Sequence, residues 1–120
     1  MIKKTISYTD YNGTERSEDF YFNLNKAELI EMKFSKHGGL ENYIKDIINA
    51  KKENELIQLF KDLVLKAYGV KSEDGRRFIK NDTLKEEFMQ TEAYSNLFME
   101  LATNEQAAIE FVNGIVPKQV

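Results

Sequence analysis

The stretch from residue 53 to residue 68, ENELIQLFKDLVLKAY, constrains the fold more than any other part of the chain. Its apolar residues recur at helical spacing: Ile57, Phe60, Val64 and Ala67 on one stripe, with Leu56, Leu59 and Leu63 beside them. A helix that is apolar around so much of its circumference must be covered on several sides. Lys66 suits the C-terminal end of the helix dipole, and Gly69 predicts that the helix stops after Tyr68. The stretch therefore predicts the centre of a folded core and carries no catalytic motif.

The length and composition predict one folded domain. The chain has 120 residues, and we expect a single domain over 1–120, with a hairpin in 1–24 and a helical part in 25–117. Hydrophobic residues at 42% and charged residues at 31% are typical of globular proteins rather than of disordered chains. The sequence contains no cysteine, which excludes disulfides, thiolate metal ligands and a cysteine nucleophile.

The charge and hydropathy patterns argue against two classes of partner. The formal net charge is -3 and acids are intermixed with bases, so no basic patch indicates nucleic-acid binding. No segment has the length of a membrane-spanning helix, and the N-terminus lacks an apolar run of signal-peptide length. We therefore expect a cytoplasmic protein that binds neither nucleic acid nor membrane.

Residues 1–24 alternate between apolar and polar side chains, which predicts a β-hairpin around the Asn12-Gly13 turn. Lys4 interrupts the apolar row, as residues at an edge or a strand end do. A two-stranded ribbon is marginal alone in water, so its aromatic face must lie on helices or pair with a strand of another copy. The positions expected to face inward are Ile2, Ile6, Tyr8, Phe20, Phe22 and Leu24.

The remainder of the chain predicts short helices. The expected segments are about three turns from Asn25, residues 40–51, the stretch 53–68, a helix capped by Asn81 or Asp82, residues 92–102 and residues 107–113. Capping boxes over 25–28 and 103–106 open the first and last of them, the 37–39 His-Gly-Gly run ends the first, and Gly114 closes the last. The polar residues 71–77 predict an exposed loop. The fold class is therefore α+β, an N-terminal β-hairpin followed by a mainly α-helical bundle of about five helices.

No residue pattern indicates a catalytic, cofactor or metal site. His37 stands beside two glycines, but no serine or cysteine motif accompanies it, and one histidine cannot make a conventional zinc site. The acids Glu73 and Asp74 do not match a calcium-binding loop, and the Gly38-Gly39 pair lacks the further residues of a phosphate-binding loop. We expect no catalytic residue, no cofactor and no metal ion.

The C-terminal third has more large apolar residues than two short helices need for one buried stripe. One interpretation is that all of them complete the core. The other is that Met99 and some aromatic residues stay exposed as a patch for a partner protein, where adaptable methionine and rigid aromatic side chains are favoured. The candidate partner-binding residues are Tyr94, Phe98, Met99 and Phe111, together with Tyr21 on the hairpin.

Segments spread over nearly the whole chain resemble small proteins encoded in the tail modules of siphophages and of prophages of Gram-positive bacteria. That family is described as tail assembly chaperones. The segments that carry the resemblance are YTDYNG at 8–13, FYFNL at 20–24, SEDG at 72–75, RFIK at 77–80, QTEAYS at 90–95, LFMELAT at 97–103 and FVNGIVP at 111–117.

The resemblance implies a function that the residue patterns alone do not give. In such a family the chaperone coats the long tape measure protein before the tail tube polymerises, and it then gives way to tube subunits. The implied partners are the tape measure protein, the tail tube protein and further copies of the chain, in the cytoplasm of the bacterial host. A structural tail completion or head-tail joining protein of the virion is the main alternative, followed by a small enzyme and a DNA-binding regulator.

Overall fold

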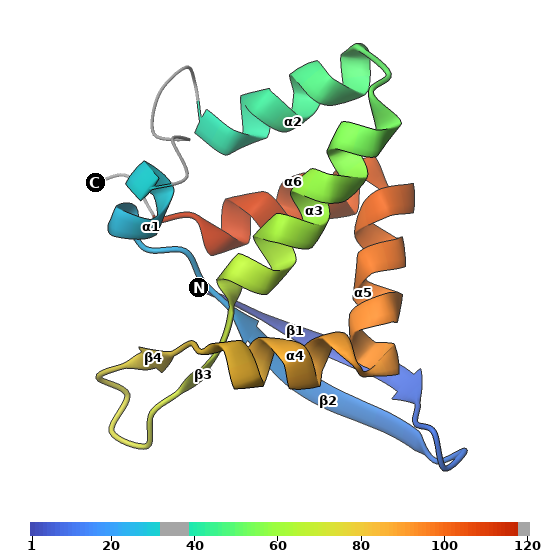
Figure 1. Cartoon of the computed structure of the whole chain (residues 1–120), viewed down its shortest axis with the longest axis vertical. Helices are drawn as coiled ribbons and strands as arrows, with labels where there is room; N and C mark the ends of the chain where they lie inside the picture. The colour runs from blue at the N-terminus through green and yellow to red at the C-terminus, as the bar shows by residue number, and fades with distance from the viewer. Residues whose placement is uncertain (32–38, 118–120) are drawn as a thin grey trace.

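The computed structural model describes residues 1–31 and 39–117, which form four strands and six helices in an α+β arrangement (Figure 1). The predicted fold class is confirmed, and a second, shorter hairpin accompanies the expected one. In chain order the elements are β1 (Ile2–Thr9), β2 (Glu15–Phe22), α1 (Lys26–Glu31), α2 (Gly39–Asn49), α3 (Glu53–Ala67), β3 (Tyr68–Lys71), β4 (Phe78–Ile79), α4 (Asp82–Met89), α5 (Glu92–Thr103) and α6 (Glu105–Ile115).

The β1–β2 hairpin is antiparallel and in register from the Ile2–Phe22 pair to the Thr9–Glu15 pair. Its loop is held by one carboxylate, because Oδ1 of Asp10 accepts hydrogen bonds from the backbone amides of Asn12 and Thr14 at 2.9 and 3.0 Å. Gly13 takes the left-handed conformation, with φ of 81°, that a residue with a side chain rarely adopts. The turn predicted from the Asn-Gly pair is therefore confirmed.

One face of this hairpin is covered by helices, as expected for a marginal ribbon. Ile6 is 6% exposed, and Phe22 and Leu24 are fully buried. Lys4, which interrupts the apolar row, directs its ammonium to Glu100 on α5, so the break in the pattern marks an ion pair between the hairpin and a helix. Figure 1 shows α2, α3, α5 and α6 gathered above the hairpin in this view.

The helix α3 lies at the centre of the buried core, as its apolar stripe predicts. Five of its residues are buried: Leu59, Phe60, Leu63, Val64 and Ala67. Residues from β1, β2 and from α2 through α6 join them in one cluster. Ile57 departs from the prediction because its side chain is 47% exposed, although it lies on the same stripe.

The end of α3 differs from the prediction. The helix ends at Ala67 and Tyr68 is extended, with φ of -65° and ψ of 140°, so Gly69 is not a left-handed helix cap. Gly69 instead lies in β3, where an added Cβ would meet the Phe78 ring at 2.7 Å and the Ile79 carbonyl oxygen at 2.8 Å. The glycine is therefore needed for close approach of two strands rather than for a turn.

The polar residues 71–77 form the tip of a second hairpin that the sequence pattern did not predict. β3 pairs with β2 through Tyr68 and with β4 through Val70, giving the sheet order β1-β2-β3-β4. Gly75, with φ of 72°, supplies the turn. The ammonium of Lys80 donates to the Asn23 carbonyl at 2.7 Å and so fixes this hairpin to the end of the first.

Side-chain caps fix the N-terminal ends of α1, α4, α5 and α6, and the two capping boxes predicted from the sequence differ in their outcome. Asn25 and Glu28 satisfy each other's backbone amides at 3.0 and 2.8 Å, which confirms the first capping box. The last helix is capped by Asn104 rather than Thr103, whose hydroxyl donates to the Met99 carbonyl one turn back. The prediction for 103–106 is therefore wrong by one residue.

Gly114 was expected to close the last helix, but α6 continues through it to Ile115. An added Cβ at Gly114 would lie 2.6 Å from Cδ1 and 2.9 Å from Cβ of Ile2. Packing against β1 therefore explains this glycine, and Val116 and Pro117 follow the helix.

His37 lies outside the described residues, and no helix of the described part is long and apolar enough to cross a membrane.

Candidate partner-binding groove

The helix α5 carries three different stripes, each with the four-residue spacing that places side chains on one face. The first stripe contacts the β1–β2 hairpin through polar groups. Its three contacts are Tyr11 Oη to Glu92 Oε1 at 3.0 Å, Asn96 Nδ2 to the Ser7 carbonyl at 3.1 Å, and Lys4 Nζ to Glu100 Oε1 at 3.1 Å.

The second stripe of α5 is buried in the core. Ala93, Leu97 and Leu101 are between 0% and 2% exposed. Together with Phe111 and Val112 of α6 they belong to the single buried cluster. This stripe positions α5 and leaves its third face open.

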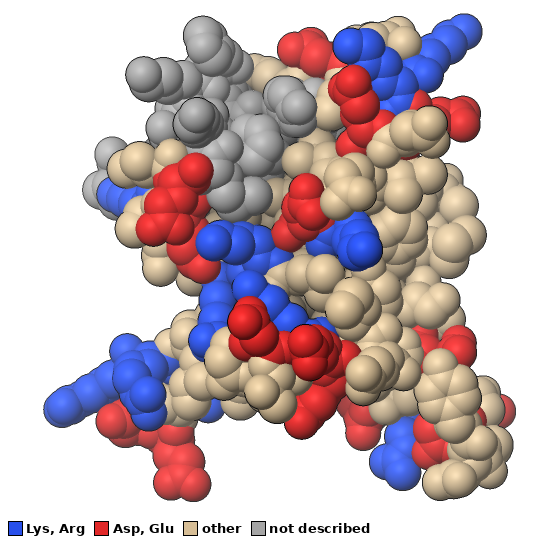
Figure 2. All heavy atoms as spheres, viewed as in Figure 1, with Lys and Arg blue, Asp and Glu red and all other residues tan. Residues whose placement is uncertain are grey.

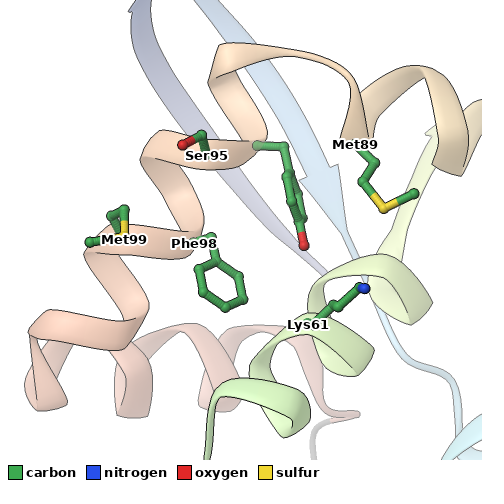
Figure 3. A pocket seen from close by; sticks show the side chains of 6 residues that line it. Lys61, Met89, Ser95, Phe98 and Met99 are labelled. Atoms are coloured by element: carbon green, nitrogen blue, oxygen red, sulfur yellow. The ribbon is translucent and has the colours of Figure 1, made fainter. Parts of the chain in front are cut away.

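The third stripe lines a groove of about 360 Å³, which we call the α5 groove. It is formed by residues from three helices, and Figure 3 shows Phe98 extending from α5 toward α3, with Lys61 on α3 and Met89 at the end of α4. Its lining residues are Lys61, Met89, Tyr94, Ser95, Phe98 and Met99.

The lining of the α5 groove is mainly apolar and partly open to solvent. Met99 is 55% and Met89 is 38% exposed, which is high for large apolar side chains. Ile57, 47% exposed, stands one turn before Lys61 on α3 and extends the apolar surface along that helix. Figure 2 shows that the surface over α5 is largely uncharged. The groove thus combines a concave shape with exposed methionine side chains.

Aromatic contacts hold the floor of the groove. The Tyr94 ring packs edge-on against Phe88 at 5.6 Å between centroids and lies 6.0 Å from the Phe98 ring. Phe88 in turn stacks on Tyr68, at 4.3 Å and 14° between planes. Burial raises the pKa of Tyr94 above its ordinary value of 10.0, which already lies well above neutral pH. Its hydroxyl is therefore protonated and can donate a hydrogen bond.

Three of the five candidate residues meet in this groove: Tyr94, Phe98 and Met99. Phe111 is 2% exposed and packs edge-on against Phe22 at 5.3 Å, so it belongs to the core. Tyr21 lies on β2, half-buried, with the Lys71 ammonium 4.5 Å from its ring centroid. These last two residues do not line the groove.

Sequence reasoning did not select Met89 and Lys61 as site residues. Met89 is one of the surplus apolar residues of the C-terminal third, but only the turn between α4 and α5 brings it beside Tyr94. Lys61 lies on α3, which β3, β4 and α4 separate from α5 along the chain, so no local sequence pattern connects the two. The sequence offered no signal for Lys61, because the exposure of Ile57 one turn earlier is visible only in the structure.

Asp74 serves a structural role. Asp74 accepts hydrogen bonds from the Ser72 hydroxyl at 2.6 Å and from the Arg76 amide at 3.0 Å, and the first of these is the main cause that lowers its pKa. Its carboxylate thus holds the tip of the β3–β4 hairpin. Among residues 1–31 and 39–117, no group of acids and histidine is arranged to hold a metal ion.

A model of one protein family, described as phage tail assembly chaperone, matches the chain over residues 1–120. The chain belongs to the phage tail assembly chaperone family. This confirms the resemblance drawn from the sequence segments. No curated protein and no solved structure matches the chain.

Membership of the tail assembly chaperone family implies protein partners in the phage tail and suggests a role that is not enzymatic. Among the described residues, the α5 groove is a surface whose composition resembles that of protein interfaces, since methionine and aromatic residues are enriched where proteins meet. Its exposed residues come from three different helices that the core holds in place.

Proposed function

We propose that this tail assembly chaperone binds amphipathic helices of the tape measure protein in the α5 groove and has no enzymatic activity. The observation that carries the proposal is the exposure of Met99 and Met89 on either side of a concave apolar surface. A helix that lays its apolar stripe into such a groove removes both surfaces from water. The long, apolar-striped partner is thereby kept from aggregating.

The composition of the groove supports a binding mode that serves many similar helices. Methionine has three rotatable bonds and adapts its shape to different side chains. Phe98 and Tyr94 supply rigid surfaces between the two methionines. This mixture suits a chaperone, because a tape measure protein offers many similar helical turns rather than one unique sequence.

The assembly step also fits this site. We propose that binding takes place in the cytoplasm of the bacterial host, before the tail tube forms, and that tube subunits of the tail tube protein then replace the chaperone. A contact made mostly of apolar side chains contains few buried hydrogen bonds, so its loss leaves few unsatisfied polar groups behind. Replacement is therefore possible without a separate energy source.

We further propose that copies of the chain associate with one another. Among the described strands, β1 lies at the edge of the sheet, and edge strands pair readily with other chains. Asn96 of α5 occupies the Ser7 carbonyl on this edge, so the proposed pairing uses the part of β1 before Ser7, which includes Thr5. Substituting proline for Thr5, Thr5→Pro, removes one backbone donor of β1. We expect a smaller mass in light scattering than for the native chain, and an unchanged oligomer would contradict pairing through β1.

The main test is co-purification with the tape measure protein encoded in the same tail gene cluster. We expect the native chain to keep the tape measure protein in the soluble fraction and to co-purify with it. Met99→Glu should abolish this, because a carboxylate would be buried against apolar side chains. The matched control is Val70→Glu, since Val70 is 41% exposed on β3 and lies outside the groove.

Two results would contradict the proposal. Equal co-purification by the Met99→Glu and Val70→Glu variants would remove the α5 groove from the contact. Mass spectrometry of purified virions provides the second test, because a chaperone should be absent or depleted there. Stoichiometric recovery from finished particles would instead support a structural tail completion or head-tail joining protein.

A further inference from the structure

One charged side chain stands among the apolar residues of the α5 groove. Lys61 is the only ionised residue of the six that line it. Its ammonium makes no ion pair with any of the residues that the structure describes, whereas Lys4, Lys66 and Lys80 each face a glutamate. Within α3 itself, the neighbours three and four residues from Lys61 are Ile57, Gln58, Val64 and Leu65, none of which is acidic.

Three acids on the helices that line the groove make contacts outside it. Asp62, next to Lys61 in sequence, accepts a hydrogen bond from Gln58 Nε2 at 2.9 Å. On α5, Glu92 and Glu100 both contact the β1–β2 hairpin on a different stripe. On α4, Lys85, Glu86 and Glu87 precede Met89, and none of the three lines the groove. The lining of the groove therefore contains one cation and no carboxylate, although the whole chain has a net charge of -3.

A second donor lies in the same groove. Within the described part of the chain, the Tyr94 hydroxyl has no hydrogen-bond partner. No buried polar atom of the described residues lacks a partner, so this hydroxyl is in contact with solvent. The groove thus presents an ammonium and a hydroxyl that are solvated in the free protein. A helix docked on the apolar lining would displace that water.

We infer that the α5 groove selects helices that carry a carboxylate at the border of their apolar stripe, and that Lys61 and Tyr94 bind this carboxylate. The inference rests on the proposed helix-binding function and names the chemistry that the site recognises. A carboxylate accepts hydrogen bonds from both groups, and bonds to a charged acceptor are stronger than neutral ones. A lysine or arginine at the same border would face Lys61 and be repelled.

This contact has a physical consequence for register. Apolar surfaces alone allow a striped helix to slide by one turn with little change in buried area. A charge pair at the edge of the contact favours the registers in which acid and lysine meet, because electrostatic complementarity contributes specificity more than raw affinity. The site would therefore read the positions of acids along a helical partner.

Synthetic helical peptides test the inference directly. Each peptide has about five turns, roughly 18 residues, with leucines on one stripe and a single glutamate that is moved from one border position to the next. Binding to the native full-length chain is measured by fluorescence anisotropy at low and high salt. We expect the best border position to bind about tenfold more tightly than the same peptide with glutamine there.

Charge reversal on the protein provides the decisive comparison. Lys61→Glu should weaken the best glutamate peptide about tenfold, and replacing that glutamate by lysine should restore binding to the variant. Lys3→Glu is the matched control, because Lys3 is exposed on β1, away from the groove, and changes the net charge equally. Lys61→Met removes the charge while keeping an apolar stem, in case the reversal disturbs folding.

The outcomes separate this inference from the function on which it rests. If the peptides bind with the same affinity whatever the glutamate position, and Lys61→Glu binds like Lys3→Glu, charge selection is wrong and helix binding stands. If no striped peptide binds the native chain, helix binding in the groove is wrong, and the selection fails with it. Restoration by the charge-swapped pair supports both.

Discussion

The two exposed sides of α5 have opposite chemistry on one helix. The side toward the hairpin uses Glu92, Asn96 and Glu100, and each of these polar groups has a partner on β1 or its loop. The side toward the groove carries Phe98, which is half-buried, and Met99, which is exposed, and no residue on the hairpin covers them. The difference shows that polar contacts here fix the fold, while the other side keeps uncovered apolar surface, on which we propose that a partner helix binds.

The buried stripe between these two sides explains how one helix can do both. Leu97 and Leu101 anchor α5 to α3 and α6, so neither exposed side has to provide much stability. Substitutions on the three stripes should therefore have clearly different effects.

The largest loss of stability is expected on the buried stripe. Leu97→Ala should lower the free energy of unfolding by about 2–5 kcal/mol, because it leaves a cavity in the core. Met99→Ala, two positions further on, should change it by no more than about 0.5 kcal/mol, because that side chain is 55% exposed. Urea denaturation followed by circular dichroism measures both. Similar losses for the two variants would mean that the groove face of α5 contributes to the stability of the fold as much as the buried stripe does.

The hydrogen bond from Asn96 to the Ser7 carbonyl should contribute less. Asn96→Ala removes the side-chain donor at the open edge of β1, and we expect a loss of about 0.5–1.5 kcal/mol. Hydrogen exchange should then be faster at the β1 amides than at those of α6. Faster exchange spread evenly over the chain would contradict a local contact between α5 and the hairpin.

The Lys4–Glu100 ion pair should contribute less again. Its side chains are 25% and 44% exposed, so water and salt screen the interaction. A double-mutant cycle with Lys4→Met and Glu100→Gln should give a coupling of about 0.2–1 kcal/mol that falls as salt is added. A coupling that is unchanged in high salt would mean that the pair is better shielded than its exposure indicates.

The smallest effect is expected in the hairpin loop and depends on pH. The hydrogen bond from Arg16 Nε is the main cause that holds the pKa of Asp10 below its ordinary value of 3.8, aided by the amides of Thr14 and Asn12. A depressed carboxyl pKa contributes stability that is complete above the unfolded-state pKa and is lost as pH falls through the folded one. Asp10→Asn should therefore show a shallower loss of stability below about pH 4 than the native chain. Identical acid profiles in urea denaturation would show that this carboxylate does not stabilise the hairpin.

Much of the fold followed from local patterns. Helix α3 begins at Glu53 as its apolar stripe predicts, and the first hairpin follows from alternation and one Gly13 turn. The second hairpin was missed because β4 has only two residues, too few for any alternation to show. Gly69 and Gly114 were misinterpreted as helix stops, since a glycine needed for close packing looks the same in sequence as one needed for a turn.

The site followed from the sequence only in part. Large apolar residues in the C-terminal third, more than two short helices need for one buried stripe, suggested Tyr94, Phe98 and Met99 as a partner surface, and burial of all of them in the core was the other interpretation. The same count could not separate them from Phe111, since exposure depends on which face meets α3 and β2. Lys61 was beyond sequence reasoning because it comes from another helix.

The sequence by itself determined most of the helical segments and the first hairpin, which of their faces are apolar, and that the C-terminal third holds more large apolar residues than one buried stripe needs. These properties depend on the periodicity of neighbouring residues, which is a local quantity. Only the tertiary structure decided which of those apolar residues remain uncovered and that Lys61 stands among them. That decision depends on how α3, α4 and α5 pack against one another, and packing between distant segments has no local signature in the chain.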